Sequence, residues 1–186
     1  VIFTSTRDHL DFPIGNWSDE RNYPQGAELY IADIDGGNRK RLTNNAYYDA
    51  EVSVSPDGTK IVFSRQVDGA LDLYLMNIDG TGERKLTDTA DWQEGAPFFL
   101  PDSKSITTRA WSRAGYGLKR PTPMTIWTIN VETGERIQRT HDDWMNWAPY
   151  PAPDGRHYVF VRPLIDNPSN WEIFLGDLAG GEPVRL

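Results

Sequence analysis

One unit of roughly 45 residues is repeated along this chain, and this repeat limits the possible folds more than any other feature. Its first copy contains a hydrophobic-aromatic pair, a turn with Gly and a basic-Leu-Thr run, which are Leu29-Tyr30, Asp35-Gly36 and Arg41-Leu42-Thr43. The later copies read Leu73-Tyr74, Asp79-Gly80 and Lys85-Leu86-Thr87; Ile126-Trp127, Thr133-Gly134 and Arg139-Thr140; and Ile173-Phe174, Ala179-Gly180 and Arg185-Leu186. The chain is therefore a row of similar units with insertions.

A second sequence motif, or mark, recurs with about the same period as the first. It is Ser55-Pro56-Asp57-Gly58, which returns as Leu100-Pro101-Asp102-Ser103 and Ala152-Pro153-Asp154-Gly155. Ser bonds back to the backbone, Pro fixes the first corner and Gly takes the left-handed position, so the mark predicts a tight hairpin turn. In the clearest unit, runs rich in Val, Ile, Tyr and Phe predict four strands, at 51–55, 60–64, 72–77 and 83–87.

Four antiparallel strands per unit, with no helical periodicity between them, predict an all-β fold of the β-propeller type. We expect a single propeller domain or propeller fragment over 1–186, with about four four-stranded blades at about 1–45, 46–90, 91–142 and 143–186. The first unit has predicted strands at 1–5, 28–34 and 39–43 but none before them, so the first blade should lack its innermost strand. Fifteen strands are expected in all.

The segment from Tyr48 to Thr87 resembles the TolB-like, or PD40, repeat through its Ser-Pro-Asp-Gly, Ile-Val-Phe-Ser-Arg, Leu-Tyr-Leu-Met-Asn-Ile-Asp-Gly and Lys-Leu-Thr strings. The likeness is looser in the third unit, where Ser103 replaces the turn Gly. This resemblance implies an arc of a larger propeller of six or more blades. It also implies a bacterial protein at a periplasmic or extracellular location that binds a protein or peptide partner. Self-association or an unusual four-bladed closure are the other ways to complete the ring.

Composition argues against several classes of partner. The chain has 19 Lys and Arg against 27 Asp and Glu, a net charge of −8, and no basic stripe, so no nucleic acid is expected as a partner. No apolar run reaches the length of a membrane span, so no membrane insertion is expected. Cysteine is absent, which excludes disulfides and thiolate metal sites and fits either redox compartment.

The loops of a four-stranded blade divide between two ends of the sheets. One end, the short-turn face, receives the Pro-Asp-Gly and Asp-Gly turns. The other, the long-loop face, receives insertions at 7–27, 110–125 and 162–171 and the blade-to-blade crossovers at 44–49, 88–94 and 141–146. Because loop aromatics give a large contact area at low entropic cost, we predict a binding surface there, made by Trp17, Tyr23, Tyr47, Tyr48, Asp49, Asp91, Trp92, Trp111, Tyr116, His141, Asp142, Asp143, Trp144 and Trp171. The alternative is that these rings pack under loops and between blades.

The densest polar cluster runs from His141 to Trp147, where a His lies beside two carboxylates. The equivalent crossovers are also acidic and aromatic, so turn hydrogen bonds to the backbone are the favoured interpretation. The chain has no nucleophile elbow, phosphate loop or metal-binding helix motif. We therefore predict no catalytic residue, no metal site and no cofactor.

Two functions remain. The favoured one is a non-enzymatic scaffold that engages a protein or peptide through the long-loop face. The alternative is the propeller portion of a hydrolase or lyase, either the gating propeller of a serine peptidase or a propeller that degrades sugar acids. In the second case loop Trp residues would stack on a carbohydrate, and Lys119-Arg120 would pair with uronate carboxylates.

Overall fold

The computed structural model describes residues 1–164 and 166–186, which form fifteen β-strands and no helix. Sheet 1 contains β1 (Ile2–Ser5), β2 (Glu28–Ile31) and β3 (Lys40–Arg41). Sheet 2 contains β4 (Tyr48–Val54), β5 (Lys60–Val67), β6 (Ala70–Asn77) and β7 (Arg84–Lys85). Sheet 3 contains β8 (Trp92–Phe99), β9 (Ser105–Ser112), β10 (Thr125–Asn130) and β11 (Arg136–Gln138). Sheet 4 contains β12 (Trp147–Pro151), β13 (His157–Pro163), β14 (Trp171–Asp177) and β15 (Val184–Arg185).

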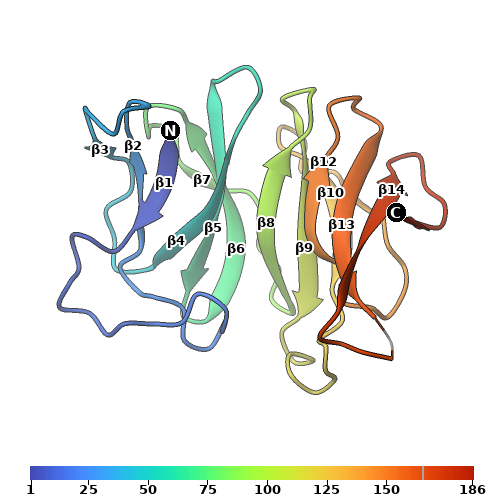
Figure 1. Cartoon of the computed structure of the whole chain (residues 1–186). Helices are drawn as coiled ribbons and strands as arrows, with labels where there is room; N and C mark the ends of the chain where they lie inside the picture. Colours follow the sequence, from blue (N-terminus) through green and yellow to red (C-terminus); the bar gives the residue numbers. More distant parts are fainter. Residues whose placement is uncertain (165) are drawn as a thin grey trace.

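Every sheet is an antiparallel meander, with its strands paired in chain order. The sheets stand side by side in sequence order (Figure 1). This confirms the predicted all-β propeller architecture, and sheet 1 has three strands because its innermost strand is missing, as expected. The outermost strand β7 is shorter than predicted, since it covers two residues. β2 is also shorter: it ends at Ile31 because Asp33 N–H already donates to Gly37 O to open the turn. No helix in the described part of the chain is long and apolar enough to cross a membrane.

The core lies between neighbouring sheets. Leu29 of sheet 1 packs on Ile61, Phe63 and Met76 of sheet 2. The next two layers join sheet 2 to sheet 3 and sheet 3 to sheet 4, and they are formed by Val62, Leu73, Leu75, Phe99, Ile106, Ile129 and Val131, and by Ile126, Tyr158 and Phe160. Sheets 2 and 3 thus bury both of their faces, which explains the near-continuous apolar runs of their second and third strands.

The two repeated sequence marks have clear structural roles. The Thr of the basic-Leu-Thr run closes the outer part of sheets 1 and 2, since Thr43 Oγ1 and Thr87 Oγ1 accept hydrogen bonds of 2.9 Å from Leu29 N–H and Leu73 N–H. In the hairpin turn, Ser55 Oγ accepts from Lys60 N–H at 2.9 Å. Ser103, which replaces Gly in the third unit, adopts the left-handed conformation with φ of 57°.

A β-bulge interrupts each complete innermost strand, and the sequence did not predict it. The pairing register shifts between Ala50 and Ser53, between Gly95 and Phe98, and between Trp147 and Tyr150. Glu51, Ala96 and Ala148, which precede the Pro of the turn by the same number of residues, have positive φ values of 52°, 48° and 52°. A bulge re-aims the side chains that follow it, so the inner ends of the sheets are shaped by a repeated irregularity.

Candidate functional site

The long insertions and the crossovers meet at one end of the sheets, as Figure 1 shows for the loops below β1, β9 and β13. Backbone hydrogen bonds join each of the first two insertions to a crossover. Gly26 N–H donates to Tyr47 O at 2.9 Å, Arg113 N–H donates to Asp91 O at 2.9 Å, and Met124 N–H donates to Trp144 O at 2.8 Å. In the third insertion, residue 165 lies outside the described residues. On the long-loop face, the first two insertions are therefore held against the crossovers by backbone hydrogen bonds.

The first insertion reaches across from sheet 1 to sheets 2 and 3. Glu20 is the anchor: its carboxylate accepts from Trp111 Nε1–H, and its backbone carbonyl accepts from Gln66 Nε2–H at 2.8 Å. Burial raises the pKa of Glu20 above its ordinary value, against the effect of the hydrogen bond from Trp111. The Arg21 guanidinium lies 5.4 Å from the centre of the Tyr116 ring, which adds a contact with the second insertion.

Beneath this insertion the aromatic rings pack on one another. Tyr23 stacks on Tyr48 with 4.4 Å between ring centres, and Trp17 lies 5.8 Å from Tyr48 in a tilted arrangement. Burial raises the pKa of the Tyr23 hydroxyl far above its usual value, so it stays protonated and able to donate. The insertion is therefore held on a stacked base and presents Trp17, which is 50% exposed, outward.

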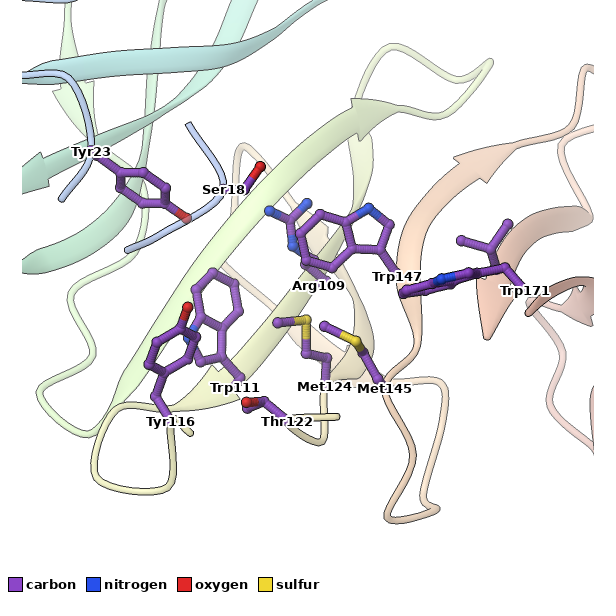
Figure 2. Close-up of a pocket in the computed structure, with 11 residues that line it drawn as sticks. Ser18, Tyr23, Arg109, Trp111, Tyr116, Thr122, Met124, Met145, Trp147 and Trp171 are labelled. Carbon is purple, nitrogen blue, oxygen red and sulfur yellow. The ribbon is translucent and has the colours of Figure 1, made fainter. Parts of the chain in front are cut away.

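A cavity of about 460 Å³, the aromatic cavity, opens on the long-loop face between sheets 3 and 4 and the first insertion. Figure 2 shows Trp147 between Arg109 and Trp171, with Met124 and Met145 beside them and Trp111 and Tyr116 on the other side. Four lining residues belong to the predicted binding set: Tyr23, Trp111, Tyr116 and Trp171. The rest were not predicted: Ser18, Arg109, Thr122, Met124, Met145, Trp147 and Val161.

Arg109 is the one charged side chain among the described residues that line this cavity, and it is 2% exposed. Its guanidinium lies 4.0 Å from the centre of the Trp147 ring and donates from Nη2 to Glu51 Oε1 at 2.6 Å. Burial alone would raise the pKa of Glu51, but Arg109 and the 2.8 Å hydrogen bond from Ala96 N–H hold this pKa below its ordinary value. The bulge of β4 and the bulge of β8 thus meet at this ion pair.

Two residues of the predicted binding set are fully enclosed. Asp49 is 0% exposed and accepts from Arg65 Nε and Nη2 at 2.6 and 2.8 Å. Tyr48 is 2% exposed under the first insertion. Neither side chain is free to contact a partner, because the first insertion covers Tyr48 and Arg65 encloses Asp49. Trp111 was expected in a loop but belongs to β9, and its buried ring forms cavity wall rather than outer surface.

The His141 crossover has the turn structure that its sequence favoured. Asp142 Oδ1 accepts from Trp144 N–H at 3.0 Å, and Asp142 Oδ2 pairs with Arg162 at 2.8 Å. Asn45 plays the same part in the first crossover, where it accepts from Tyr47 N–H at 2.8 Å. His141 and Asp143 are exposed, and Asp143 pairs with Lys119 of the second insertion.

The outer part of the surface consists of exposed aromatic side chains. Trp17, Tyr47, Trp92 and Trp171 are 50%, 40%, 38% and 46% exposed, and Asp91 is exposed beside Trp92. Among the described residues, Tyr150 is the other Trp, Tyr or Phe exposed to this degree. Trp144, half-buried, lines a recess of about 340 Å³ with Lys119 and Arg120.

Sequence reasoning missed the cavity because its walls come from two sheets and from loops that are far apart in the sequence. Arg109 looked like an ordinary strand residue, and Met124 carried no motif. Met145 and Trp147 were noted only as members of the His141–Trp147 cluster. One signal was available: Ser64, Arg109 and Val161 occupy equivalent positions of the second strands, and Arg109 is the charged member of this set. No group of three His, Cys, Asp or Glu side chains within residues 1–164 and 166–186 is placed to hold a metal ion.

No family model and no curated protein matches the chain, but solved structures do. A putative TolB from Agrobacterium tumefaciens is 25% identical, with a TM-score of 0.68 over 86% of this chain and 56% of that one. TolB from Acinetobacter baumannii is 22% identical, with a TM-score of 0.70 over 90% and 39% of the two chains. The chain has a TolB-like β-propeller fold.

The TolB-like propeller is shared with an enzyme as well. An oligogalacturonate lyase from Vibrio parahaemolyticus is 16% identical, with a TM-score of 0.68 over 100% of this chain and 49% of that one. The chain spans between 39% and 56% of the length of these three structures. The likeness therefore establishes a partial propeller, and the fold alone does not separate a scaffold from an enzyme.

Proposed function

We propose that this TolB-like propeller is a binding scaffold whose long-loop face engages a protein or peptide partner. The observation that carries the proposal is the unequal distribution of exposed aromatics: Trp17, Tyr47, Trp92 and Trp171 lie on that face, and Trp171 also lines the aromatic cavity. Exposed aromatic rings beside a concave apolar site are typical of protein interfaces. The TolB likeness adds the expectation of a periplasmic or extracellular location.

The architecture suits this role. The first and second insertions are each fixed to a crossover by backbone hydrogen bonds, and Glu20 ties the first insertion to sheet 3. A preformed surface loses little conformational entropy when a partner binds, so more of the contact energy appears as affinity. The net charge of −8 adds a preference for a basic or neutral partner over an acidic one.

The test is selection of binding peptides from a displayed random library, followed by affinity measurement on variants. Trp17→Ala, Trp92→Ala and Trp171→Ala together should weaken peptide binding at least about tenfold, because hot-spot aromatics dominate interface energies. All three side chains are 38% or more exposed, so folding should be retained. The matched control is Ile34→Ala on the short-turn face, which is 91% exposed. Equal binding by the triple variant and the wild type would overturn the proposal.

The second candidate, a carbohydrate-binding propeller portion of a lyase, is favoured by the recess that Trp144 forms with Lys119 and Arg120. A ring for stacking and cations for a carboxylate are the features that recognition of a uronate needs. Lys119 is already paired with Asp143, which leaves Arg120 as the unpaired cation in this recess among the described residues. Saturable binding of digalacturonate that Arg120→Ala abolishes would establish this function instead.

A further inference from the structure

The aromatic cavity has the shape and surface of a site for a flat apolar group. Trp147 and Trp171 provide ring faces on one side, and Trp111 and Tyr116 provide them on the other (Figure 2). Its volume of about 460 Å³ is in the range of pockets that enclose small ligands. Met124 and Met145 add flexible apolar surface that adapts to a guest. Offset or edge-to-face contact with these rings favours an aromatic guest over an aliphatic one.

The polar groups of the cavity leave hydrogen-bond donors unused. Arg109 is 2% exposed, yet its one hydrogen bond to the described residues runs from Nη2 to Glu51. Its Nε is fully buried without an acceptor. Buried guanidinium donors normally have partners, because an unmade hydrogen bond costs the full desolvation penalty. A guest oxygen cannot reach the enclosed Nε, so it would accept from the terminal guanidinium nitrogens of Arg109, which lines the cavity.

The charge of the cavity selects against an anionic guest. Glu51 lies 2.6 Å from Arg109 and compensates its positive charge. A carboxylate entering the cavity would gain little from the compensated guanidinium and would lose its hydration in an apolar enclosure. A neutral carbonyl or hydroxyl oxygen avoids this penalty and still accepts the free hydrogen bond.

We propose that the aromatic cavity is a specificity site for an uncharged aromatic side chain of a bound peptide, with a neutral oxygen of that residue accepting a hydrogen bond from Arg109. This inference rests on the proposed function for the identity of the guest. The site itself is testable with a small probe and without the partner, so the two proposals fail separately.

The experiment is titration of the folded chain with N-acetylphenylalaninamide, followed by tryptophan emission, because Trp111, Trp147 and Trp171 line the cavity. The probe should change the emission saturably. N-acetylphenylalanine, which carries a carboxylate, and N-acetylleucinamide, which lacks the ring, should each bind about tenfold more weakly. Tighter binding of the carboxylate, equal binding of the leucine amide, or binding of digalacturonate but not of the neutral aromatic probe would overturn the inference.

A conservative variant isolates the role of Arg109. Arg109→Lys keeps the positive charge beside Glu51 but removes the second donor nitrogen, and should weaken the neutral aromatic probe about tenfold. Arg84→Lys is the matched control, because Arg84 donates to Val131 O on the short-turn face. Unchanged affinity in Arg109→Lys would contradict the hydrogen bond. If that variant fails to fold, the ranking of the three probes on the wild-type chain still decides the inference.

Discussion

Sheets 2 and 4 use an arginine of their second strand in one way, and sheet 3 uses its arginine in another. In sheet 2, Arg65 lies over the Phe63 and Tyr74 rings at 5.2 and 4.6 Å and forms a two-atom contact with Asp49. In sheet 4, Arg162 occupies the equivalent position. It lies over two Phe rings, at 5.4 and 4.7 Å, and bonds to the crossover that begins the sheet. In both sheets the arginine is closed into the structure.

In sheet 3 that position is Ala110, as the pairing of Glu94 with Ala110 and of Asp49 with Arg65 shows. The neighbouring residue, Arg109, projects from the opposite face of the sheet, because side chains alternate along a strand. Glu94, which would have lost its partner, is paired with Arg136 at 3.0 Å. A displacement of one residue therefore transfers a guanidinium from the packed side of a sheet to the wall of the aromatic cavity.

The difference teaches that a repeat position can be identified as structural or functional from the number of its hydrogen bonds. Arg65 donates four hydrogen bonds to two carboxylates, whereas Arg109 donates one and keeps a buried Nε without an acceptor. A fully satisfied buried arginine stabilises the fold, and a partly satisfied one beside a cavity is available to a ligand.

The largest expected effect is on the closed arginine. Arg65→Ala should lower the free energy of unfolding by about 4 kcal/mol, because it leaves the fully buried Asp49 without its partner. Denaturant unfolding followed by circular dichroism measures this. Arg156→Ala is the control, since Arg156 is 67% exposed in its pair with Asp177 and should cost about 0.5 kcal/mol or less. A similar loss of unfolding free energy in Arg65→Ala and Arg156→Ala would contradict the structural role given to Arg65.

The next effect concerns the ion pair at the cavity. Glu51→Gln should cost about 2 kcal/mol at neutral pH, less than Arg65→Ala because Glu51 is 23% exposed. The folded-state pKa of Glu51 lies below the ordinary value of 4.5. The stabilising contribution is therefore complete above pH 4.5 and is lost as the pH falls through the folded-state pKa. Unfolding free energies of wild type and variant across this range should converge at acidic pH, and a constant difference would contradict the assignment.

Sequence patterns predicted the fold further than they predicted the site. The turns and the Thr of the basic-Leu-Thr run can be predicted from the sequence, because their local hydrogen bonds require those residue types. The bulges at Glu51, Ala96 and Ala148 have no such mark, since three different contexts and no Gly carry the positive φ. The cavity could not be predicted because it forms where sheets 3 and 4 meet the first insertion, which is far away in the sequence. Alternation along β9 placed Trp111 inward, whereas its position next to a long insertion had suggested a loop.

The smallest expected effect is that of Arg109→Lys on stability, and it is most informative beside Arg65→Lys. Arg65→Lys should cost about 2 kcal/mol, because an ammonium cannot replace two bidentate contacts. Arg109→Lys should cost less than about 1 kcal/mol, because a single hydrogen bond to Glu51 is retained in kind. Thermal or denaturant unfolding of the two variants side by side measures the gap. Equal costs would mean that Arg109 is as structural as Arg65.

The meeting of the two bulges, where Glu51 of sheet 2 accepts from Ala96 N–H and pairs with Arg109 of sheet 3, limits how these units can be exchanged. Repeat proteins are often shuffled or shortened at unit boundaries, on the assumption that each unit is a self-sufficient module. Here a cut between the second and third units would leave the buried Arg109 in one product and Glu51, its counter-charge, in the other. The second and third units therefore depend on each other, and a chimaera that replaces one of them should replace both.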